Sequence, residues 1–210
     1  MENKYLNEAI IGNKKIIATF TSKGEMQRIY FPSRDNKQYI NYFHTGVKIN
    51  ESDLIYLHDD INNTYNQYYS KNTNVLNTEI TNSYFKLNII QTDFVPIREN
   101  VLIKRYTFEN KNNIDLNVNL LLHSGLLTNS NNQVSGAYKE NALMQYTHDY
   151  TVSTFSKDMP LSFQINNTME NIASGIIGGK DYVGMSNDSS ISYDIGTIKP
   201  GENKYIDIFI

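Results

Sequence analysis

The sequence contains no cysteine and no tryptophan, and only four of its 210 residues are proline. The absence of cysteine excludes disulfide bridges, thiolate metal sites and cysteine nucleophiles. Packing and hydrogen bonds must therefore stabilise the fold. No apolar run approaches the roughly 20 residues that a membrane-spanning helix needs, so we expect no membrane partner.

An excess of positive charge is also missing. The chain has 19 Lys and Arg against 22 Asp and Glu, which gives a formal net charge of −3. A nucleic-acid-binding domain needs a basic face that displaces counterions from phosphates, so nucleic acid is not an expected partner. The first twenty residues, MENKYLNEAIIGNKKIIATF, lack the basic segment and apolar core of a signal peptide, and we expect a cytoplasmic protein.

Period-two alternation of apolar and polar residues dominates the chain. In DLNVNLLLH, Asp115–His123, every second residue from Leu116 to Leu122 is apolar, and YIDIFI, Tyr205–Ile210, repeats the pattern. Such alternation predicts half-buried β-strands. Further strands are expected at Ile16–Phe20, Met26–Phe31, Leu54–His58, Val75–Thr81, Tyr84–Phe94, Val101–Glu109, Leu143–Tyr146, Tyr150–Ser156, Tyr182–Met185 and Ile191–Ile195.

Turn signals separate these strands. They are SKGE at 22–25, TNSY at 81–84, NKNN at 110–113, GG at 178–179 and KPGE at 199–202. Only Met169–Ile177 is expected to form a short helix or turn. About a dozen short strands on this spacing predict an all-β fold, an antiparallel sandwich, and no shift in composition divides residues 1–210 into two domains.

The last expected strand, Ile206–Ile210, ends without a polar tail. The backbone groups at such an end, and those of its neighbours, would be poorly covered. This predicts that the chain is part of a longer protein.

The four histidines carry no metal-site spacing. A zinc or iron site is usually signalled by short spacings such as His-x-x-x-His, and none occurs among the histidines at 44, 58, 123 and 148, although strands could bring them together. Neighbours in a strand point to opposite faces, so at most two of His58, Asp59 and Asp60 could converge on an ion. We expect the two aspartates to cap a turn, and we expect no metal site and no cofactor.

Two further polar groupings have structural interpretations. His123-Ser124-Gly125 follows a leucine-rich strand, but it lacks the Gly-x-Ser-x-Gly turn between strand and helix that a serine hydrolase needs. We therefore interpret it as a structural histidine and serine at the close of a core strand. His148-Asp149 lies at a strand junction and is interpreted as a turn.

Aromatic residues crowd into QYINYFHTG, 38–46, and NTYNQYYS, 63–70, beside Asn, Gln, His and Asp. Flat rings with polar rims are used in carbohydrate binding, in protein contacts and in ordinary cross-strand packing. All three roles of these aromatic residues therefore stay open. The residues that we predict to form a protein or carbohydrate contact are Tyr39, Tyr42, His44, His58, Asp59, Asp60, Tyr65, Gln67, Tyr68 and Tyr69.

The order of several motifs carries a family resemblance. The motifs are IGN at 11–13, the Gly24-Glu25 turn leading to Tyr30–Pro32, the following Asp35, and VLIKRYTFEN at 101–110. Together with the strands around them, they resemble the N-terminal domain of bacterial glycoside hydrolase family 15, the glucoamylase and glucodextranase type, in a clostridial form. The resemblance covers essentially all 210 residues.

The resemblance implies a galactose mutarotase-like β-supersandwich of two stacked sheets, placed ahead of a catalytic (α/α)₆ barrel. In such enzymes two carboxylates of the barrel hydrolyse α-glucans with inversion. That barrel would follow residues 1–210, so the resemblance implies no catalytic residue in this chain. The expected partners are the protein's own C-terminal catalytic domain and an α-glucan or maltooligosaccharide. The absence of tryptophan is a departure from usual sugar-binding platforms.

Three alternatives remain beside this interpretation. The first is a free-standing carbohydrate-binding module that uses the tyrosine cluster. The second is a mutarotase-like epimerase, in which a histidine and a glutamate act as acid and base. The third is the similar N-terminal domain of a disaccharide phosphorylase.

Overall fold

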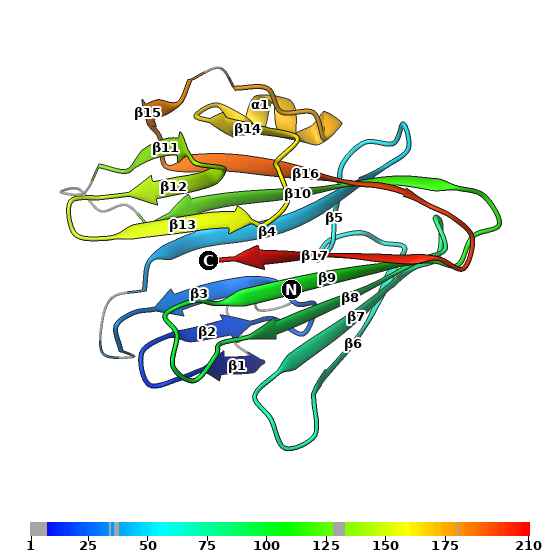
Figure 1. Cartoon of the computed structure of the whole chain (residues 1–210), viewed down its shortest axis with the longest axis horizontal. Coiled ribbons are helices and arrows are strands. Elements are labelled where there is room, and N and C mark those ends of the chain that lie inside the picture. The colour runs from blue at the N-terminus through cyan, green and yellow to red at the C-terminus, as the bar shows by residue number, and fades with distance from the viewer. Residues whose placement is uncertain (1–7, 34, 36–37, 128–132, 180) are drawn as a thin grey trace.

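Alternating apolar and polar residues build two antiparallel β-sheets that stack face to face (Figure 1). The computed structural model describes residues 8–33, 35, 38–127, 133–179 and 181–210. The first sheet contains, in spatial order, β1 (Ala9–Gly12), β2 (Ile17–Phe20), β3 (Met26–Tyr30), β4 (Ile40–Ile49), β10 (Leu116–Leu126), β16 (Asp188–Ile198) and β14 (Ser162–Ile165), with the short β5 (Ile55–Tyr56) paired to β4. The second contains β15 (Val183–Met185), β11 (Ser135–Lys139), β12 (Ala142–Tyr146), β13 (Thr151–Ser156), β17 (Asn203–Phe209), β9 (Ile103–Asn110), β8 (Leu87–Phe94), β7 (Leu76–Asn82) and β6 (Asn63–Tyr69).

The main core lies between the sheets. In β10, the four alternate apolar residues from Leu116 to Leu122 are at most 1% exposed, and the asparagines between them face the other side of the sheet. A hydrogen bond of 2.7 Å joins Thr45 Oγ1 of β4 to the Tyr106 hydroxyl of β9 across the core. The predicted all-β class and the two stacked antiparallel sheets are confirmed.

A second, smaller apolar cluster lies on part of the outer face of the first sheet. Leu121 of β10 packs there against Ile172 and Ile177. Ile172 and Ile177 belong to the segment that contains α1 (Thr168–Asn171) and the 3₁₀ turn Ile172–Ser174, which confirms the short helix expected near Met169–Ile177. No helix in the described ranges is long and apolar enough to span a membrane.

The expected strand Leu54–His58 is wrong in length. Only Ile55–Tyr56 is extended, and it pairs with β4 in the first sheet, whereas β6 pairs with β7 in the second. The chain therefore crosses from one sheet to the other after β5 and forms no hairpin. The physical reason is Leu57, which is 3% exposed and buries its side chain in the main core at the crossing.

One more expected strand begins later than predicted, and some observed strands were not predicted. The strand expected at Tyr84–Phe94 begins only at Leu87, because Asn82 Oδ1 accepts the Phe85 N–H and Lys86 adopts φ +51°, which form a turn. The ten-residue strand β4 was not predicted as a strand. Its polar and aromatic outer residues obscured the alternation of its inward residues.

Candidate functional site

Three of the four histidines meet on the outer face of the first sheet. His44 of β4 lies opposite His123 of β10 in the strand register, and His123 lies opposite Ser190 of β16. Opposed residues in neighbouring strands point to the same face, so this register makes a polar row across the sheet. His58, from the loop after β5, lies against His44 with ring centroids 4.7 Å apart, while the His44 and His123 rings are 6.3 Å apart.

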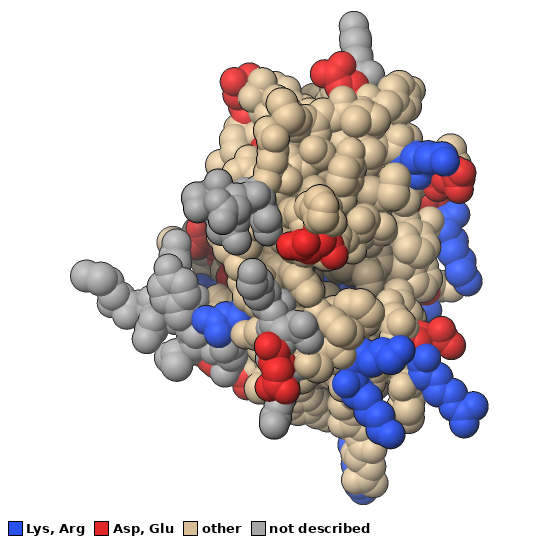
Figure 2. Space-filling view, turned by 90° about the vertical axis from the view of Figure 1, so that its left-hand side faces the viewer, with Lys and Arg blue, Asp and Glu red and all other residues tan. Residues whose placement is uncertain are grey.

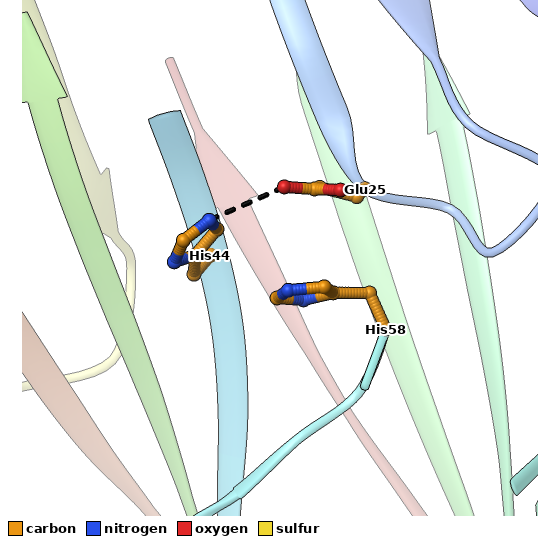
Figure 3. A group of neighbouring side chains, drawn as sticks. All are labelled: Glu25, His44 and His58. Carbon is orange, nitrogen blue, oxygen red and sulfur yellow. Dashed lines mark ion pairs between the residues drawn. The ribbon is translucent and has the colours of Figure 1, made fainter. Parts of the chain in front are cut away.

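Glu25 joins this histidine cluster from the turn before β3. Its Oε1 lies 3.2 Å from His44 Nε2 (Figure 3). The turn is held by Thr21, whose Oγ1 accepts the backbone N–H groups of Lys23 and Glu25. Gly24 takes a positive φ of 79°, a conformation that only glycine adopts without strain. The SKGE turn predicted from the sequence therefore positions a carboxylate.

His58 is positioned by its neighbour Leu57. The Leu57 N–H donates to the Thr45 carbonyl at 2.9 Å, and the Leu57 carbonyl accepts hydrogen bonds from Asn63 Nδ2 at 3.0 Å and the Tyr65 hydroxyl at 2.7 Å. Burial lowers the pKa of His58; the charges of Glu25 and Asp59 oppose that shift. The neutral imidazole is therefore favoured, and a neutral imidazole can accept a proton or bind a metal ion.

Tyr42 and Asp188 flank His123. The Tyr42 hydroxyl lies 3.2 Å from His123 Nε2, and Asp188 Oδ2 lies 3.8 Å from the same nitrogen. Interaction with His123 lowers the pKa of Asp188, with help from Ser186, although burial opposes the shift. Burial and then the charge of Asp188 raise the pKa of Tyr42, so its hydroxyl stays protonated.

Gly125 makes room for this arrangement. A Cβ at Gly125 would lie 2.6 Å from Cε1 of the Tyr42 ring and 2.9 Å from the Asn187 carbonyl.

His123 Nδ1 and Ser190 Oγ are buried and have no hydrogen-bond partner among the residues that the structure describes. The expected burial of His123 is confirmed, since the residue is 1% exposed, but its ring belongs to the polar cluster. Ser124 points the other way and hydrogen-bonds Gln145.

The predicted contact residues therefore separate into several places. Tyr42, His44 and His58 belong to the cluster. Asp60 Oδ1 accepts the Asn62 N–H at 2.6 Å, which confirms its predicted role in a turn, and Asp59 is exposed beside it. Tyr65 supports the loop that carries His58, since its hydroxyl donates to the Leu57 carbonyl.

The residues of β6 alternate between two faces. Gln67 Nε2 donates to the Thr21 carbonyl and to Thr78 Oγ1, inside the chain. The Tyr69 hydroxyl both donates to the Ile10 carbonyl and accepts the Ile10 N–H, and so joins the edge strands β6 and β1. Tyr68 points outward and is 42% exposed. The tyrosines of NTYNQYYS thus form no common platform.

Tyr39 lies elsewhere, at the end of the sandwich where the C-terminal residue Ile210 also lies. Its ring contacts that of Tyr150 at 4.1 Å between centroids, and its hydroxyl donates to the Phe31 carbonyl. Both rings border a mainly apolar cavity of about 280 Å³. Figure 2 looks onto this end, where uncharged surface predominates and charged side chains are scattered. His148 is also outside the histidine cluster: it is 95% exposed beside Asp149.

Two chemical capacities follow from the cluster geometry. The Glu25–His44 pair joins a carboxylate to an imidazole and can move a proton. Glu25, His44 and His58 also offer three ligand atoms within 4.8 Å of one another, a set that could hold a metal ion. The grouping of Glu25, His44 and His58 was not predicted, because these residues come from the turn before β3, from β4 and from the loop after β5. Only the outward position of His44 in an alternating strand could have indicated it.

Comparisons with known proteins place the fold. No protein-family model matches the chain. It is 26% identical to an uncharacterized glycosyl hydrolase of Methanocaldococcus jannaschii over 196 residues, which cover 89% of this chain and 31% of that protein. In structure, it matches a bacterial glucoamylase complexed with acarbose with a TM-score of 0.73 and 13% identity, over 97% of this chain and 32% of the other. It also matches a galactose mutarotase related enzyme from Lactobacillus acidophilus with a TM-score of 0.56 and 9% identity, over 95% of each chain.

The chain therefore has a galactose mutarotase-like supersandwich fold, as the family resemblance implied. More particularly, it is similar in sequence to a glycosyl hydrolase and in fold to part of a glucoamylase. It spans about a third of the length of each of these two proteins.

Proposed function

We propose that the chain is the N-terminal, non-catalytic domain of a glucoamylase-like hydrolase of glycoside hydrolase family 15 that acts on α-glucans. In this proposal the domain packs on a catalytic (α/α)₆ barrel and supports the loops of its active-site face. The two carboxylates of an inverting hydrolase belong to that barrel. Residues 1–210 then supply contacts and no catalytic group.

The observation that carries the proposal is the extent of the matches. Nearly the whole chain corresponds to about a third of a glucoamylase, and about the same share of a glycosyl hydrolase is similar in sequence. A domain that occupies one third of such a protein leaves room for a separate catalytic domain. The motif order from IGN to VLIKRYTFEN supports the same assignment.

Tyr68 is the residue of β6 that we assign to contact with the barrel or with an α-glucan. Its hydroxyl donates to Glu79 Oε1 at 2.9 Å, and Asn66 Nδ2 donates to Oε2 of the same carboxylate at 3.1 Å. An exposed ring with a polar rim is suited to either partner. Tyr65 and Tyr69 are less suited, because their hydroxyls bond backbone groups of this chain.

The segment between β13 and β16 offers a second surface for the barrel. It carries α1, β14 and β15, which lie together at the top of Figure 1. Seven large apolar side chains in this segment are more than half exposed: Met159, Leu161, Met169, Ile176, Tyr182, Val183 and Met185. Exposed apolar side chains in such number favour a protein contact over a solvated surface.

The test compares the full-length gene product with residues 1–210 in the release of glucose from maltooligosaccharides. We expect release by the full-length protein and none by residues 1–210. Tyr68→Ala should lower full-length activity while leaving the circular dichroism of the domain unchanged. Tyr205→Ala, which removes another exposed tyrosine from the outer face of the same sheet, is the matched control.

Other results would assign other functions. A gene that ends at the Ile210 codon, or hydrolysis by residues 1–210 alone, would contradict the proposal. Saturable binding of maltooligosaccharide by residues 1–210 in calorimetry would favour a free-standing carbohydrate-binding module. Formation of a sugar phosphate by the full-length protein, dependent on added phosphate, would identify a disaccharide phosphorylase.

The Glu25–His44 pair favours a second candidate, a mutarotase-like epimerase. A carboxylate and an imidazole 3.2 Å apart can serve as base and acid on a sugar hydroxyl and ring oxygen. The test is the rate of anomer interconversion of glucose and galactose with residues 1–210. Acceleration that is lost in Glu25→Gln would support this candidate, and a rate equal to that of buffer would exclude it.

A further inference from the structure

We propose that Glu25, His44 and His58 together bind one divalent transition-metal ion, with zinc as the best-suited ion. Two imidazole nitrogens and one carboxylate oxygen are the donor types that zinc takes at sites with an open fourth position. The same set also suits other first-row metals, because affinity follows donor type and geometry. The proposal concerns this chain alone and does not depend on the hydrolase assignment.

The distances fit a tetrahedral ion after a small side-chain movement. Zinc bonds of about 2.0–2.1 Å to nitrogen and oxygen place neighbouring ligand atoms roughly 3.3 Å apart. Glu25 Oε1 and His44 Nε2 already lie 3.2 Å apart. All three donor atoms lie within 4.8 Å of one another, so His58 must approach the other two donors by about 1.5 Å at most. Figure 3 shows the His58 ring beside the Glu25–His44 pair.

Backbone contacts hold the three donors in place. His44 is in the middle of β4, between strands β3 and β10. Glu25 is held by the turn around Thr21, where the Gly24 carbonyl also accepts a hydrogen bond from the buried Gln91 at 2.7 Å. His58 follows Leu57, whose N–H and carbonyl are both hydrogen-bonded. Side chains whose backbone is already fixed lose less conformational freedom on binding an ion.

The site is half-buried, which suits an ion that enters from solvent. The side chains of His44 and Glu25 are 28% and 21% exposed. The Tyr42 and Tyr56 rings pack beside the His44 ring, at 5.0 and 5.5 Å between centroids, and so restrict its orientation. This packing distinguishes the site from a chance group of surface side chains.

Lys23 is a nearby positive charge that opposes cation binding. It belongs to the turn that carries Glu25, and its charge acts on His58. Replacing this charge with a neutral amide should therefore strengthen the binding of a divalent cation. Lys23→Gln provides a test in the opposite direction from the ligand variants.

The experiment titrates the chelator-treated protein with Zn²⁺ in calorimetry near neutral pH, and with Co²⁺ in visible absorption. We expect one ion per chain and Co²⁺ d–d bands of the intensity typical of four-coordination. His44→Gln, His58→Gln and Glu25→Gln should each weaken Zn²⁺ binding by at least about tenfold, and Lys23→Gln should tighten it. The control is His148→Gln, which removes an exposed histidine elsewhere and should leave the affinity unchanged.

Circular dichroism of each variant checks its fold, and the titration of the unaltered protein is informative even if one variant unfolds. The absence of saturable Zn²⁺ binding by the folded protein would overturn the proposal. Undiminished binding by a folded His44→Gln, His58→Gln double variant would also overturn it. Loss of binding in His148→Gln would place the ion at the exposed His148-Asp149 pair and would contradict the assignment.

Discussion

Replacing Lys104 with methionine should lower the free energy of unfolding by about 3–5 kcal/mol, because it leaves a buried carboxylate without its cation. Lys104 of β9 lies opposite Asp93 of β8, with Nζ 2.6 Å from Oδ1. The side chains are 1% and 0% exposed. Gln91 Nε2 donates to the other Asp93 oxygen at 2.6 Å, and the Phe20 ring lies 4.9 Å from Nζ.

A double-mutant cycle separates the value of the pair from the cost of breaking it. Asp93→Asn alone should cost about as much as Lys104→Met, since it leaves a buried ammonium group unpaired. The free energy of unfolding of the double variant should lie within about 1–2 kcal/mol of that of the unaltered protein, because the double variant removes both charges and keeps the hydrogen bond from Gln91. Urea unfolding followed by tyrosine fluorescence and circular dichroism measures all four free energies.

The pH dependence of Lys104→Met provides an independent check. Burial already raises the pKa of Asp93, and Lys104 opposes that shift, so removing Lys104 raises the pKa further. A folded state that binds the proton more tightly than the unfolded chain is most stable below the ordinary carboxyl pKa and loses stability as pH rises through the raised pKa. The cost of Lys104→Met should therefore shrink in acid. Single variants that each cost under about 1 kcal/mol, or strictly additive costs in the double variant, would refute the reasoning.

Three further variants test the site and the sheet edge. Gly125→Ala should cost about 1–3 kcal/mol in urea unfolding, because its Cβ would overlap a tyrosine ring and a backbone carbonyl. Gly178→Ala should cost much less, because its Cβ would meet no atom of the described residues within 4 Å. Tyr69→Phe removes the two hydrogen bonds of the Tyr69 hydroxyl to β1 and should lower the free energy of unfolding by about 1–2 kcal/mol. Tyr68→Phe should lower it by less than about 0.5 kcal/mol. Equal losses in the two variants would contradict the role of Tyr69 in joining the two edge strands. Asp188→Asn should flatten the fall in stability with acid, because His123 lowers the pKa of the Asp188 carboxyl. The stability that this carboxylate contributes is present above the ordinary carboxyl pKa and is lost as pH falls through the lowered pKa. An unchanged fall in acid would contradict the interaction with His123.

Local patterns in the sequence determined the fold class and several elements within it. The alternation in Leu116–Leu122 and in Tyr205–Phe209 predicted which side chains enter the core, because successive residues of a strand point to opposite faces whatever the partner strand is. The SKGE turn was predictable for a similar reason. A turn that needs a glycine with positive φ is specified by four consecutive residues and does not depend on the rest of the chain.

Only the tertiary structure decided which residues form the site. His44 and His123 are 79 positions apart in the sequence and become neighbours through the pairing of β4 with β10, and that register depends on the packing of the whole sheet. The crossing after β5 likewise depends on the burial of Leu57 in the main core. Hydrogen bonds to the backbone of Leu57 and of Ile10 give Tyr65 and Tyr69 their structural roles. Strand periodicity is a local property, but strand pairing is a property of the complete core, and the cluster of Glu25, His44 and His58 follows from the pairing.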